Sequence, residues 1–400
     1  MKVLMLGWEL PPHNSGGLGV ACLQLSKALA KSGADIDFIL PYSSDEKYEF
    51  MRVTSAQPKN VKSIFKSQAY DSYKYILQDG KEVSVSIADQ QQAYEIAVGE
   101  IIKGKEFDVI HAHDWLTFRA GLRAKQQTGK PLIAHVHSIE RDRAGGKHGN
   151  PLVREIEYTG FMMADRIIAV SGRVKKMIAE DYSIPEDKIE VVHNSIDQSF
   201  LEPLDTNNAY KYLEYMKGQG WSVVVNIGRL TIQKGLPHFL RAAGEVAKFA
   251  PKTFFLIVGD GEQRDELIEL AAEQGIADRV IFTGFQRGKN WRDAYSVADL
   301  FVMPSVSEPF GLTPLEAVAY GTPAMISKQS GISEVLQNCL KVDYWDEHEM
   351  ANQIVGLLQN SSLRDELHQN AYREYERMSW SKAANQLMDI YRSHTEKVFA

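Results

Sequence analysis

The chain has 400 residues, more than one ordinary domain usually holds, so two domains of similar size are expected. Its hydrophobic content of 44% and charged content of 24% are ordinary for a globular protein with sizeable apolar cores. A formal net charge of −7 without a long basic tract argues against nucleic acid as the main partner. The two cysteines, Cys22 and Cys339, imply no disulfide framework, and no apolar run reaches the length of a membrane span. These features predict a cytoplasmic protein without a transmembrane segment.

A short apolar run opens the chain and leads into a glycine-rich loop. Residues 2–6 have the pattern of a buried parallel strand, and a periodic helix is predicted from about residue 20 to residue 31. Between them stand Gly16, Gly17 and Gly19, in an order that matches neither the dinucleotide fingerprint nor the P-loop. Glycines at a helix N-terminus let the backbone approach an anion, so we predict a phosphate-binding loop; a plain tight turn is the alternative.

Two acidic residues at the start of the next strand match an Asp-x-Asp metal-binding signature. Asp35 and Asp37 precede the apolar residues of a strand predicted over 36–40. Because ligand sites favour the carboxyl ends of parallel strands, we interpret this match as a solvated strand entry. Further on, residues 73–77 and 82–87 flank Asp-Gly and predict a hairpin.

Four histidines alternate along two later predicted strands: His111 and His113 in the first, His135 and His137 in the second. Residues i and i+2 of a strand face the same side, so a metal site comes into consideration. No cysteine or carboxylate cluster completes a ligand set in the sequence, and we therefore predict no metal. His137 stands at the carboxyl end of its strand, where ligands bind, whereas His135 is expected to be a core histidine.

A charged, glycine-bearing loop follows His137. Its candidate substrate-binding side chains are Arg141, Arg143, Lys147 and His148, and a mobile surface loop is the alternative. Beyond it, strands and helices alternate throughout, which predicts a doubly wound parallel sheet.

After a predicted linker at about residues 201–208, strands and helices again alternate in the second half of the chain. A strand over residues 221–228 leads into Gly-Arg-Leu-x-x-x-Lys-Gly, which places Arg229 and Lys234 at the strand's end. A guanidinium fork and an ammonium at that position would neutralise a diphosphate, although two ordinary surface cations are the alternative.

Two carboxylates flank the last conspicuous loop. A buried strand over residues 299–304 ends at a proline, Glu308 follows in the loop, and Glu316 falls in the first turn of the next helix. Between them, the backbone N–H groups of residues 310–312 stand at the helix N-terminus, where anions and sugar hydroxyls can bind.

These motifs together resemble the retaining glycosyltransferases of family 4, over nearly the full length of the chain. The resemblance rests on the Glu-x7-Glu signature at Glu308 and Glu316, the Gly-Arg-Leu-x-x-x-Lys-Gly element, the Gly-Gly loop and the His-Ala-His-Asp-Trp segment. It implies the GT-B fold, an α/β architecture of two Rossmann-like doubly wound domains facing each other across a cleft. The expected parts are residues 1–204 (acceptor side), residues 205–379 (donor nucleotide) and residues 380–400, a helix returning to the first domain.

The resemblance also implies roles for individual residues. Glu308 would bind hydroxyls of the donor sugar and Glu316 those of the ribose, while Arg229 and Lys234 hold the diphosphate and His137 contacts the reacting sugar. The implied catalytic residues are His137, Glu308, Arg229 and Lys234. The implied donor-binding residues are Gly16, Gly17, Arg229, Lys234, Gly284, Phe285, Glu308, Phe310, Gly311, Leu312 and Glu316. A nucleotide sugar would be the co-substrate, with no further cofactor and no metal.

The start of the chain and the His-Ala-His-Asp-Trp segment are most similar to glycogen and starch synthases. This similarity implies retaining transfer of glucose from UDP- or ADP-glucose to an α-glucan. Asn14-Ser15 depart from that pattern, in which a lysine often precedes Gly-Gly. A small sugar, a sugar phosphate or a glycoconjugate is therefore the alternative acceptor. A GT-B sugar-nucleotide epimerase and a non-catalytic nucleotide-sugar binder are the alternative classes.

Overall fold

The computed structural model describes residues 1–13, 16–68, 72–197, 201, 203–204 and 207–395. The chain divides into two compact units. Unit 1 comprises Met1–Ile139, Asn150–Asn194 and Trp380–Ala400, and unit 2 comprises Glu140–Gly149 and Ser195–Ser379. The sequence predicted that the first domain ends at residue 204. In the structure the middle segment of unit 1 ends at Asn194, and residues 140–149 belong to unit 2. The chain thus leaves unit 1 and re-enters it twice.

Unit 1 is built on a parallel sheet. Among the described residues the sheet has seven strands, in the order β10-β9-β8-β7-β1-β2-β3. The strands are β1 (Lys2–Leu6), β2 (Asp35–Leu40), β3 (Arg52–Ser55), β7 (Val109–His113), β8 (Leu132–Val136), β9 (Arg166–Ala169) and β10 (Ile189–Val191). β7 and β8 are buried at every residue because helices cover both faces, as apolar runs of parallel strands require.

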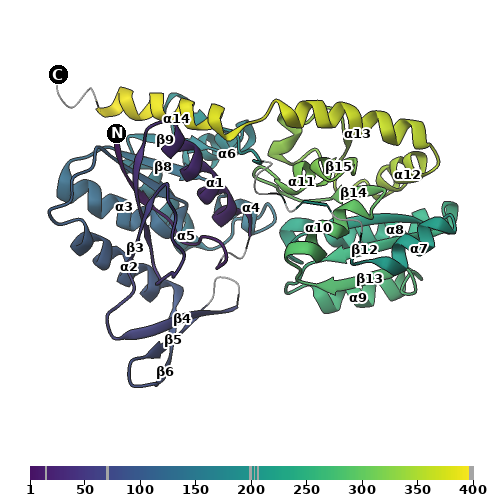
Figure 1. Ribbon diagram of the computed structural model, residues 1–400, viewed down its shortest axis with the longest axis horizontal. Helices are drawn as coiled ribbons and strands as arrows, with labels where there is room; N and C mark the ends of the chain where they lie inside the picture. The colour runs from purple at the N-terminus through teal and green to yellow at the C-terminus, as the bar shows by residue number, and fades with distance from the viewer. Residues whose placement is uncertain (14–15, 69–71, 198–200, 202, 205–206, 396–400) are drawn as a thin grey trace. The chain divides into compact units, whose positions relative to one another are not determined.

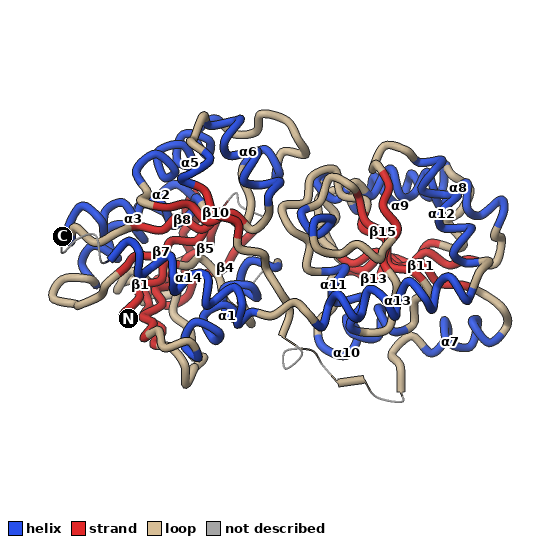
Figure 2. Tube along the Cα trace, turned by 90° about the horizontal axis from the view of Figure 1, so that it is seen from above, coloured by secondary structure: helices blue, strands red, loops and turns tan. Residues whose placement is uncertain are grey.

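Two helix layers cover that sheet. The helices are α1 (Gly17–Lys31), α2 (Ile87–Ile101), α3 (Trp115–Thr128), α5 (Pro151–Met163), α6 (Gly172–Tyr182) and α14 (Trp380–Thr395). α1 and α14 lie side by side on one face, and α5 and α6 lie on the other (Figure 2). The last helix of the chain is therefore part of unit 1. Its Trp380 Nε1 donates a hydrogen bond to Gln24 Oε1 of α1 at 2.6 Å.

A small antiparallel sheet extends unit 1. It consists of β4 (Val61–Gln68), β5 (Ser72–Leu77) and β6 (Glu82–Ser86), and β5 and β6 form the hairpin that the sequence predicted. Trp8 Nε1 donates to the Tyr73 hydroxyl at 2.7 Å, which ties this sheet to the loop after β1.

Unit 2 carries a second parallel sheet, with six strands among its described residues. Its order is β13-β12-β11-β14-β15-β16. The strands are β11 (Ser222–Ile227), β12 (Thr253–Val258), β13 (Val280–Gly284), β14 (Leu300–Met303), β15 (Ala324–Ser327) and β16 (Leu340–Val342). The strand order reverses between β11 and β14, and ligands of open α/β sheets bind at such a switch point. The Gly-Arg-Leu-x-x-x-Lys-Gly element follows β11, and the Glu-x7-Glu signature follows β14.

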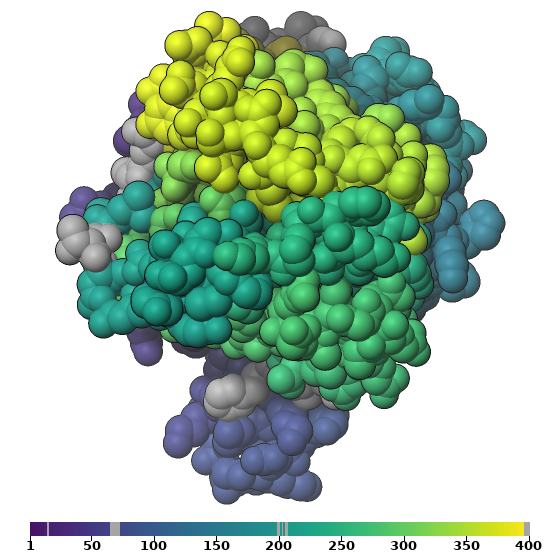
Figure 3. All heavy atoms as spheres, turned by 90° about the vertical axis from the view of Figure 1, so that its right-hand side faces the viewer, coloured from purple at the N-terminus to yellow at the C-terminus, as the bar shows by residue number. Residues whose placement is uncertain are grey.

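The helices of unit 2 bury their apolar sides against this sheet and one another. They are α4 (Glu140–Arg143), α7 (Lys211–Gly218), α8 (Leu236–Phe249), α9 (Arg264–Glu273), α10 (Gly288–Ser296), α11 (Thr313–Ala319), α12 (Glu347–Leu358) and α13 (Ser361–Glu376). Short 3-10 turns are η1 (Glu186–Lys188) in unit 1, and η3 (Ile232–Lys234) and η4 (Gly331–Glu334) in unit 2. Figure 3 shows α12 and α13, in yellow-green, lying against the earlier, green part of the unit. None of the described helices combines the length and the apolar character needed to cross a bilayer.

Candidate functional site

The switch point of unit 2 brings together two residues that lie 74 positions apart in sequence. Lys234 Nζ donates to Glu308 Oε2 at 2.6 Å, and Ser305 Oγ donates to the same oxygen at 2.9 Å. Glu308 is 7% exposed, so the carboxylate is held in place by partners rather than by solvent. The pairing follows from topology, because β11 and β14 are neighbouring parallel strands and both residues stand just beyond their carboxyl ends.

The backbone of the Glu308 loop is fixed by its own hydrogen bonds. Gly331 N donates to Glu308 O at 2.9 Å, and Ile332 N donates to Phe310 O at 2.7 Å. Phe310 is buried, and Gly311 has a φ of +100°, which a residue with a side chain rarely adopts. A Cβ at Gly311 would also lie 3.0 Å from Met303 Cε. The loop therefore presents its backbone in one defined conformation.

Glu316 lies at the start of α11, where Leu312 is the N-cap residue. The Tyr295 hydroxyl donates to Glu316 Oε2 at 2.6 Å. Burial of the carboxyl group raises the pKa of Glu316 to about 7, and the hydrogen bond from Tyr295 opposes this rise. Burial likewise raises the pKa of Tyr295 well above its ordinary value, so the phenol remains the donor. Tyr295 was not predicted, because a tyrosine on a different helix gives no motif.

Arg229 follows Gly228 in the turn after β11, and this turn packs tightly against the turn after β12. Leu230 N donates to Asp260 O at 3.0 Å. Gly259 has a φ of +146°, and a Cβ there would lie 1.8 Å from Gly228 O. The close approach of two backbones is thus the reason for glycine at this position. It fixes the turn from which Arg229 projects.

The predicted base-binding residues end β13. Gly284 has a φ of +70°, and its carbonyl accepts a hydrogen bond from Gly259 N at 2.9 Å. Phe285 is 59% exposed, and the Arg287 guanidinium carbon lies 5.1 Å from the centroid of its ring. An exposed aromatic ring beside a cation offers a stacking surface.

The predicted acceptor loop packs against the Glu308 loop within unit 2. Ser307 Oγ donates to Asp142 Oδ1 at 2.5 Å, and Asp142 is fully buried. Arg143 Nε donates to Glu140 Oε2 at 3.0 Å, so Arg143 is engaged by its own helix. Asp142 was not predicted from the sequence, because its partner Ser307 is 165 residues away.

The glycine loop of unit 1 ends at the start of α1. Gly16 is the N-cap residue, with an extended backbone and no side chain to cap the helix, and both Gly16 and Gly17 are exposed. Asn14 and Ser15, where the sequence departs from the glycogen-synthase pattern, fall outside the described residues.

The four histidines form a buried cluster on one face of the unit 1 sheet. His111 Nε2 and His135 Nδ1 are 3.0 Å apart, and His113 Nδ1 and His137 Nε2 are also 3.0 Å apart. His111 Nδ1 pairs with the Tyr391 hydroxyl of α14. Burial lowers the pKa of His137 to about 3, so its ring is neutral at physiological pH. For the other three, burial first and then the neighbouring histidines hold the pKa well below its ordinary value.

Some ring nitrogens of this cluster lack partners. Among the described residues nothing hydrogen-bonds His113 Nε2, His135 Nε2 or His137 Nδ1. The backbone N–H of His137 donates to Asp114 Oδ1 at 2.7 Å, which fixes the end of β8. His137 is 9% exposed and stands at the outer end of the cluster. Its unpartnered Nδ1 is itself buried.

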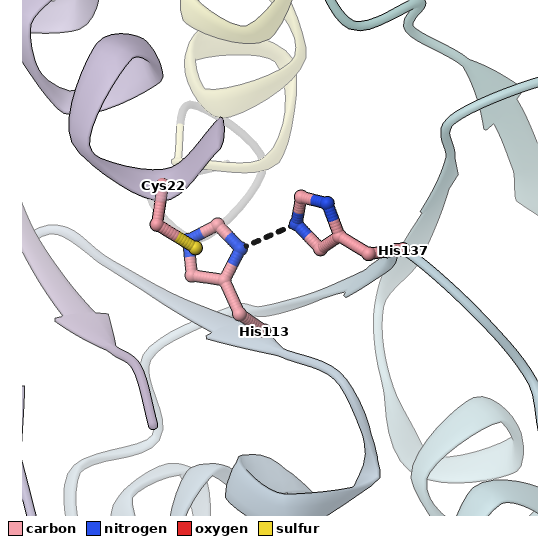
Figure 4. Close-up of side chains that lie close together, drawn as sticks. All are labelled: Cys22, His113 and His137. Atoms are coloured by element: carbon pink, nitrogen blue, oxygen red, sulfur yellow. Dashed lines mark hydrogen bonds between the residues drawn. The ribbon is translucent and has the colours of Figure 1, made fainter. Parts of the chain in front are cut away.

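Cys22 lies close to two of these histidines, a contact that the sequence did not predict. One candidate ligand atom each from Cys22, His113 and His137 lies within 4.8 Å of the others, and His111, His113 and His135 form a second such group. Figure 4 shows Cys22 reaching from α1 toward the ring of His113 while His137 faces that ring from the neighbouring strand. The sequence showed no cysteine that would complete a ligand set with these histidines, because the rotation of α1 on the sheet is a tertiary feature.

Two family models match the chain, one in each half. The model described as Glycosyltransferase Family 4 matches residues 15–200, and that described as Glycosyl transferases group 1 matches residues 216–374. A D-inositol 3-phosphate glycosyltransferase of Rhodococcus erythropolis is 31% identical over 72% of this chain and 68% of its own length. The chain belongs to the glycosyltransferases.

Other glycosyltransferases match over more of the chain. An uncharacterised glycosyltransferase of Methanocaldococcus jannaschii is 28% identical, covering 98% of each chain. A glycogen synthase of Mycobacterium tuberculosis is 27% identical over 84% of this glycosyltransferase and 80% of its own length.

Solved structures establish the fold. Sucrose-phosphate synthase of Thermosynechococcus elongatus matches with a TM-score of 0.78 and 20% identity, covering 98% of each chain. Anabaena HepE in complex with UDP and glucose matches with a TM-score of 0.73 and 19% identity, covering 98% of this chain and all of that one. The predicted GT-B fold of two Rossmann-like domains is confirmed.

Proposed function

We propose that this glycosyltransferase transfers glucose, with retention of anomeric configuration, from a nucleoside-diphosphate glucose to a carbohydrate acceptor of the α-glucan class. The observation that carries the proposal is the pairing of Lys234 with buried Glu308 at the switch point of unit 2, beside the turn that bears Arg229. The glycogen synthase relative supports the acceptor class, and HepE with bound UDP and glucose supports the donor class.

The donor would be held by groups of different chemistry. Arg229 and Lys234 would bind the diphosphate, because cations stabilise the negative charge that grows as the leaving group departs. Glu308 and the backbone of residues 310–312 would bind the sugar hydroxyls, and Glu316 would accept hydrogen bonds from the ribose. Gly284 and Phe285 would line the binding site of the nucleotide base.

Unit 1 would contribute the remaining contacts. The exposed backbone at Gly16 and Gly17 would approach the donor diphosphate, at the N-terminus of a 15-residue helix. Neutral His137 would offer its unpartnered Nδ1 to a hydroxyl of the reacting sugar. As the bond to the diphosphate breaks, the anomeric carbon gains oxocarbenium character. The departing phosphate would take the acceptor's proton, so that the acceptor oxygen attacks from the same face.

A phosphorylated small acceptor is the second candidate. It is favoured by the 31%-identical relative, which is named a D-inositol 3-phosphate glycosyltransferase. The loop from Arg141 to His148 would then read the acceptor phosphate, with Lys147 and His148 as its exposed basic side chains.

The test is a screen of UDP-, ADP- and GDP-sugars with a glucan primer, with a cyclitol or sugar phosphate, and without an acceptor. The anomeric configuration of the product is read by NMR. Glu308→Gln and the Arg229→Ala, Lys234→Ala double variant should each lower kcat/KM by ~100-fold or more, because each removes charge stabilisation at the leaving group or the sugar.

Lys328→Ala is the matched control. Lys328 is a cation of the same unit that pairs with Asp343 at 2.9 Å but keeps a side chain 53% exposed, so its loss should leave turnover unchanged. An inverted product would refute retention. Tight donor binding without turnover in any acceptor arm would instead identify a non-catalytic binder.

A further inference from the structure

The histidine cluster of unit 1 contains more potential metal-ligating side chains than sugar transfer requires. A single histidine suffices for the sugar contact proposed above, yet three further histidines and a cysteine surround it. All of them are buried, and they come from β7, β8 and α1. Thiol and imidazole groups gathered in one place are the ligand types of transition-metal sites.

We propose that Cys22, His113 and His137 form a binding site for a thiophilic divalent cation of the Zn²⁺ class. Zn²⁺ binds thiolate and imidazole ligands in tetrahedral geometry. Two imidazole nitrogens on one Zn²⁺, at about 2.0–2.1 Å each, lie roughly 3.3 Å apart. His113 Nδ1 and His137 Nε2 are 3.0 Å apart, so a small rotation of either ring reaches that spacing. Cys22 supplies the third ligand atom within 4.8 Å of both rings (Figure 4).

The three side chains are of the types that Zn²⁺ binds. A neutral imidazole keeps one lone pair for a cation. Cys22 binds as the thiolate, so its thiol proton passes to solvent when the cation enters.

The Cys22 group is preferred over the group of His111, His113 and His135. Three neutral imidazoles would leave the full double charge of the cation in a buried pocket, whereas one thiolate cancels half of it. The second group also lies deeper, since all three of its members are at most 1% exposed and His111 is already engaged by Tyr391. With three protein ligands, the fourth position is left for water.

Binding of the metal alone tests the site. Co²⁺ added to the whole protein should produce a thiolate-to-cobalt charge-transfer absorption that is stoichiometric, disappears with a chelator and is absent in Cys22→Ser. Cys339→Ser is the matched control, because Cys339 is the other cysteine and lies in unit 2. The absence of this absorption in the parent protein would overturn the proposal, as would its loss in Cys339→Ser rather than in Cys22→Ser.

Zn²⁺ affinity, measured by competition with a chelating dye, provides the second readout. Cys22→Ser and His113→Ala should each weaken binding by more than ~100-fold, since losing even a group that only orients a ligand costs roughly 10–100-fold. His238→Ala should have no effect, because His238 pairs with Glu347 in unit 2. Circular dichroism checks that the variants fold, and Cys22→Ala provides a second substitution if the serine variant does not. Parent-like affinity in folded Cys22 variants would refute the site.

Inhibition by Zn²⁺ extends the inference and rests on the proposed function. Because the His137 ring must turn to hold the cation by Nε2, its Nδ1 moves away from the sugar hydroxyl, so Zn²⁺ should lower turnover of the parent and not that of Cys22→Ser, each compared with its own metal-free rate. If no donor is turned over, the proposed function fails while the cobalt spectrum still decides the metal site. If turnover is normal and cobalt does not bind, only the metal site fails.

Discussion

Burial, more than charge pairing, sets the ionisation of several side chains in the two candidate sites. It raises the pKa of Glu316 to about 7 and lowers that of His137 to about 3, which in both cases favours the neutral form. The consequence differs between them. His137 stays neutral across the physiological range and can act as an uncharged hydrogen-bonding group, whereas Glu316 changes charge close to neutral pH.

This difference predicts a pH dependence of nucleotide binding. In the proposed function Glu316 binds the ribose. As pH rises through about 7, Glu316 loses its proton and would accept hydrogen bonds from both ribose hydroxyls, so affinity for UDP or ADP should increase. The hydrogen bond from Tyr295 stabilises the carboxylate. Tyr295→Phe should therefore move the midpoint to higher pH and weaken binding at pH 7 by ~7-fold, given the roughly 1.5 kcal/mol of a hydrogen bond to a charged group.

Isothermal titration calorimetry between pH 5.5 and 8.5 measures both effects. Glu316→Gln should show no such pH dependence, and Tyr344→Phe, a tyrosine of the same unit that packs on Trp345, should behave like the parent. A midpoint that stays in place, or moves to lower pH, in Tyr295→Phe would contradict the assignment.

At the scale of elements, the turns after β11 and β14 hold the site of unit 2 in place. Gly235 joins η3 to α8 with a φ of +66°, and a Cβ there would lie 2.1 Å from the carbonyl oxygen of Pro304, at the end of β14. The turn bearing Lys234 is thus pressed against the strand end that leads to Glu308. Glycine is required here for both the conformation and the contact.

Gly235→Ala should therefore destabilise unit 2 by ~2–4 kcal/mol, combining the cost of a left-handed alanine with a backbone clash. The matched change Gly356→Ala should stabilise by roughly 0.5–1 kcal/mol, because Gly356 lies inside α12 with nothing within 4 Å of its would-be Cβ. Hydrogen exchange of the β11 and β14 amides measures both changes. Equal effects of the two substitutions would show that the contact with Pro304 does not constrain the turn.

At the scale of the whole molecule, the chain returns to unit 1 at its end. α14 follows unit 2 in sequence, yet its buried side chains belong to the core of unit 1. Besides Trp380, Asn385 Oδ1 accepts from Ser32 Oγ at 2.9 Å, and Gln386 Nε2 donates to Val191 O at 2.9 Å. Tyr391 contacts the histidine cluster, so the end of the chain also supports the candidate site of unit 1.

Deleting residues 380–400 should therefore destabilise unit 1 and spare unit 2. The loss should be at least ~4 kcal/mol, because Leu387, Met388 and Tyr391 leave the core and each large apolar side chain contributes about 1.5–3 kcal/mol when buried. Peptide-resolved hydrogen exchange distinguishes the units: protection of β1, β7 and β8 should fall, while that of β11 and β12 stays. Equal loss in both sheets would contradict this assignment of α14.

The sequence by itself determined the alternation of strands and helices, the family resemblance and the candidate residues at strand ends. These features are local: apolar runs, glycines before helices and cations just after strands are set by neighbours in the chain. The meeting of Lys234 with Glu308 could be anticipated, because motifs at the ends of adjacent parallel strands share one edge of a sheet.

Only the tertiary structure decided which side chains complete the sites. Tyr295 reaches Glu316 from another helix, Asp142 reaches Ser307 across 165 residues, and Cys22 reaches the histidines from α1. No periodicity encodes these contacts, because the rotation of a helix on a sheet and the path of a connecting loop are set by packing of the whole core. Burial is also set by the packing of the whole core, and for this reason the ionisation of Glu316 and His137 could not be predicted from the sequence alone.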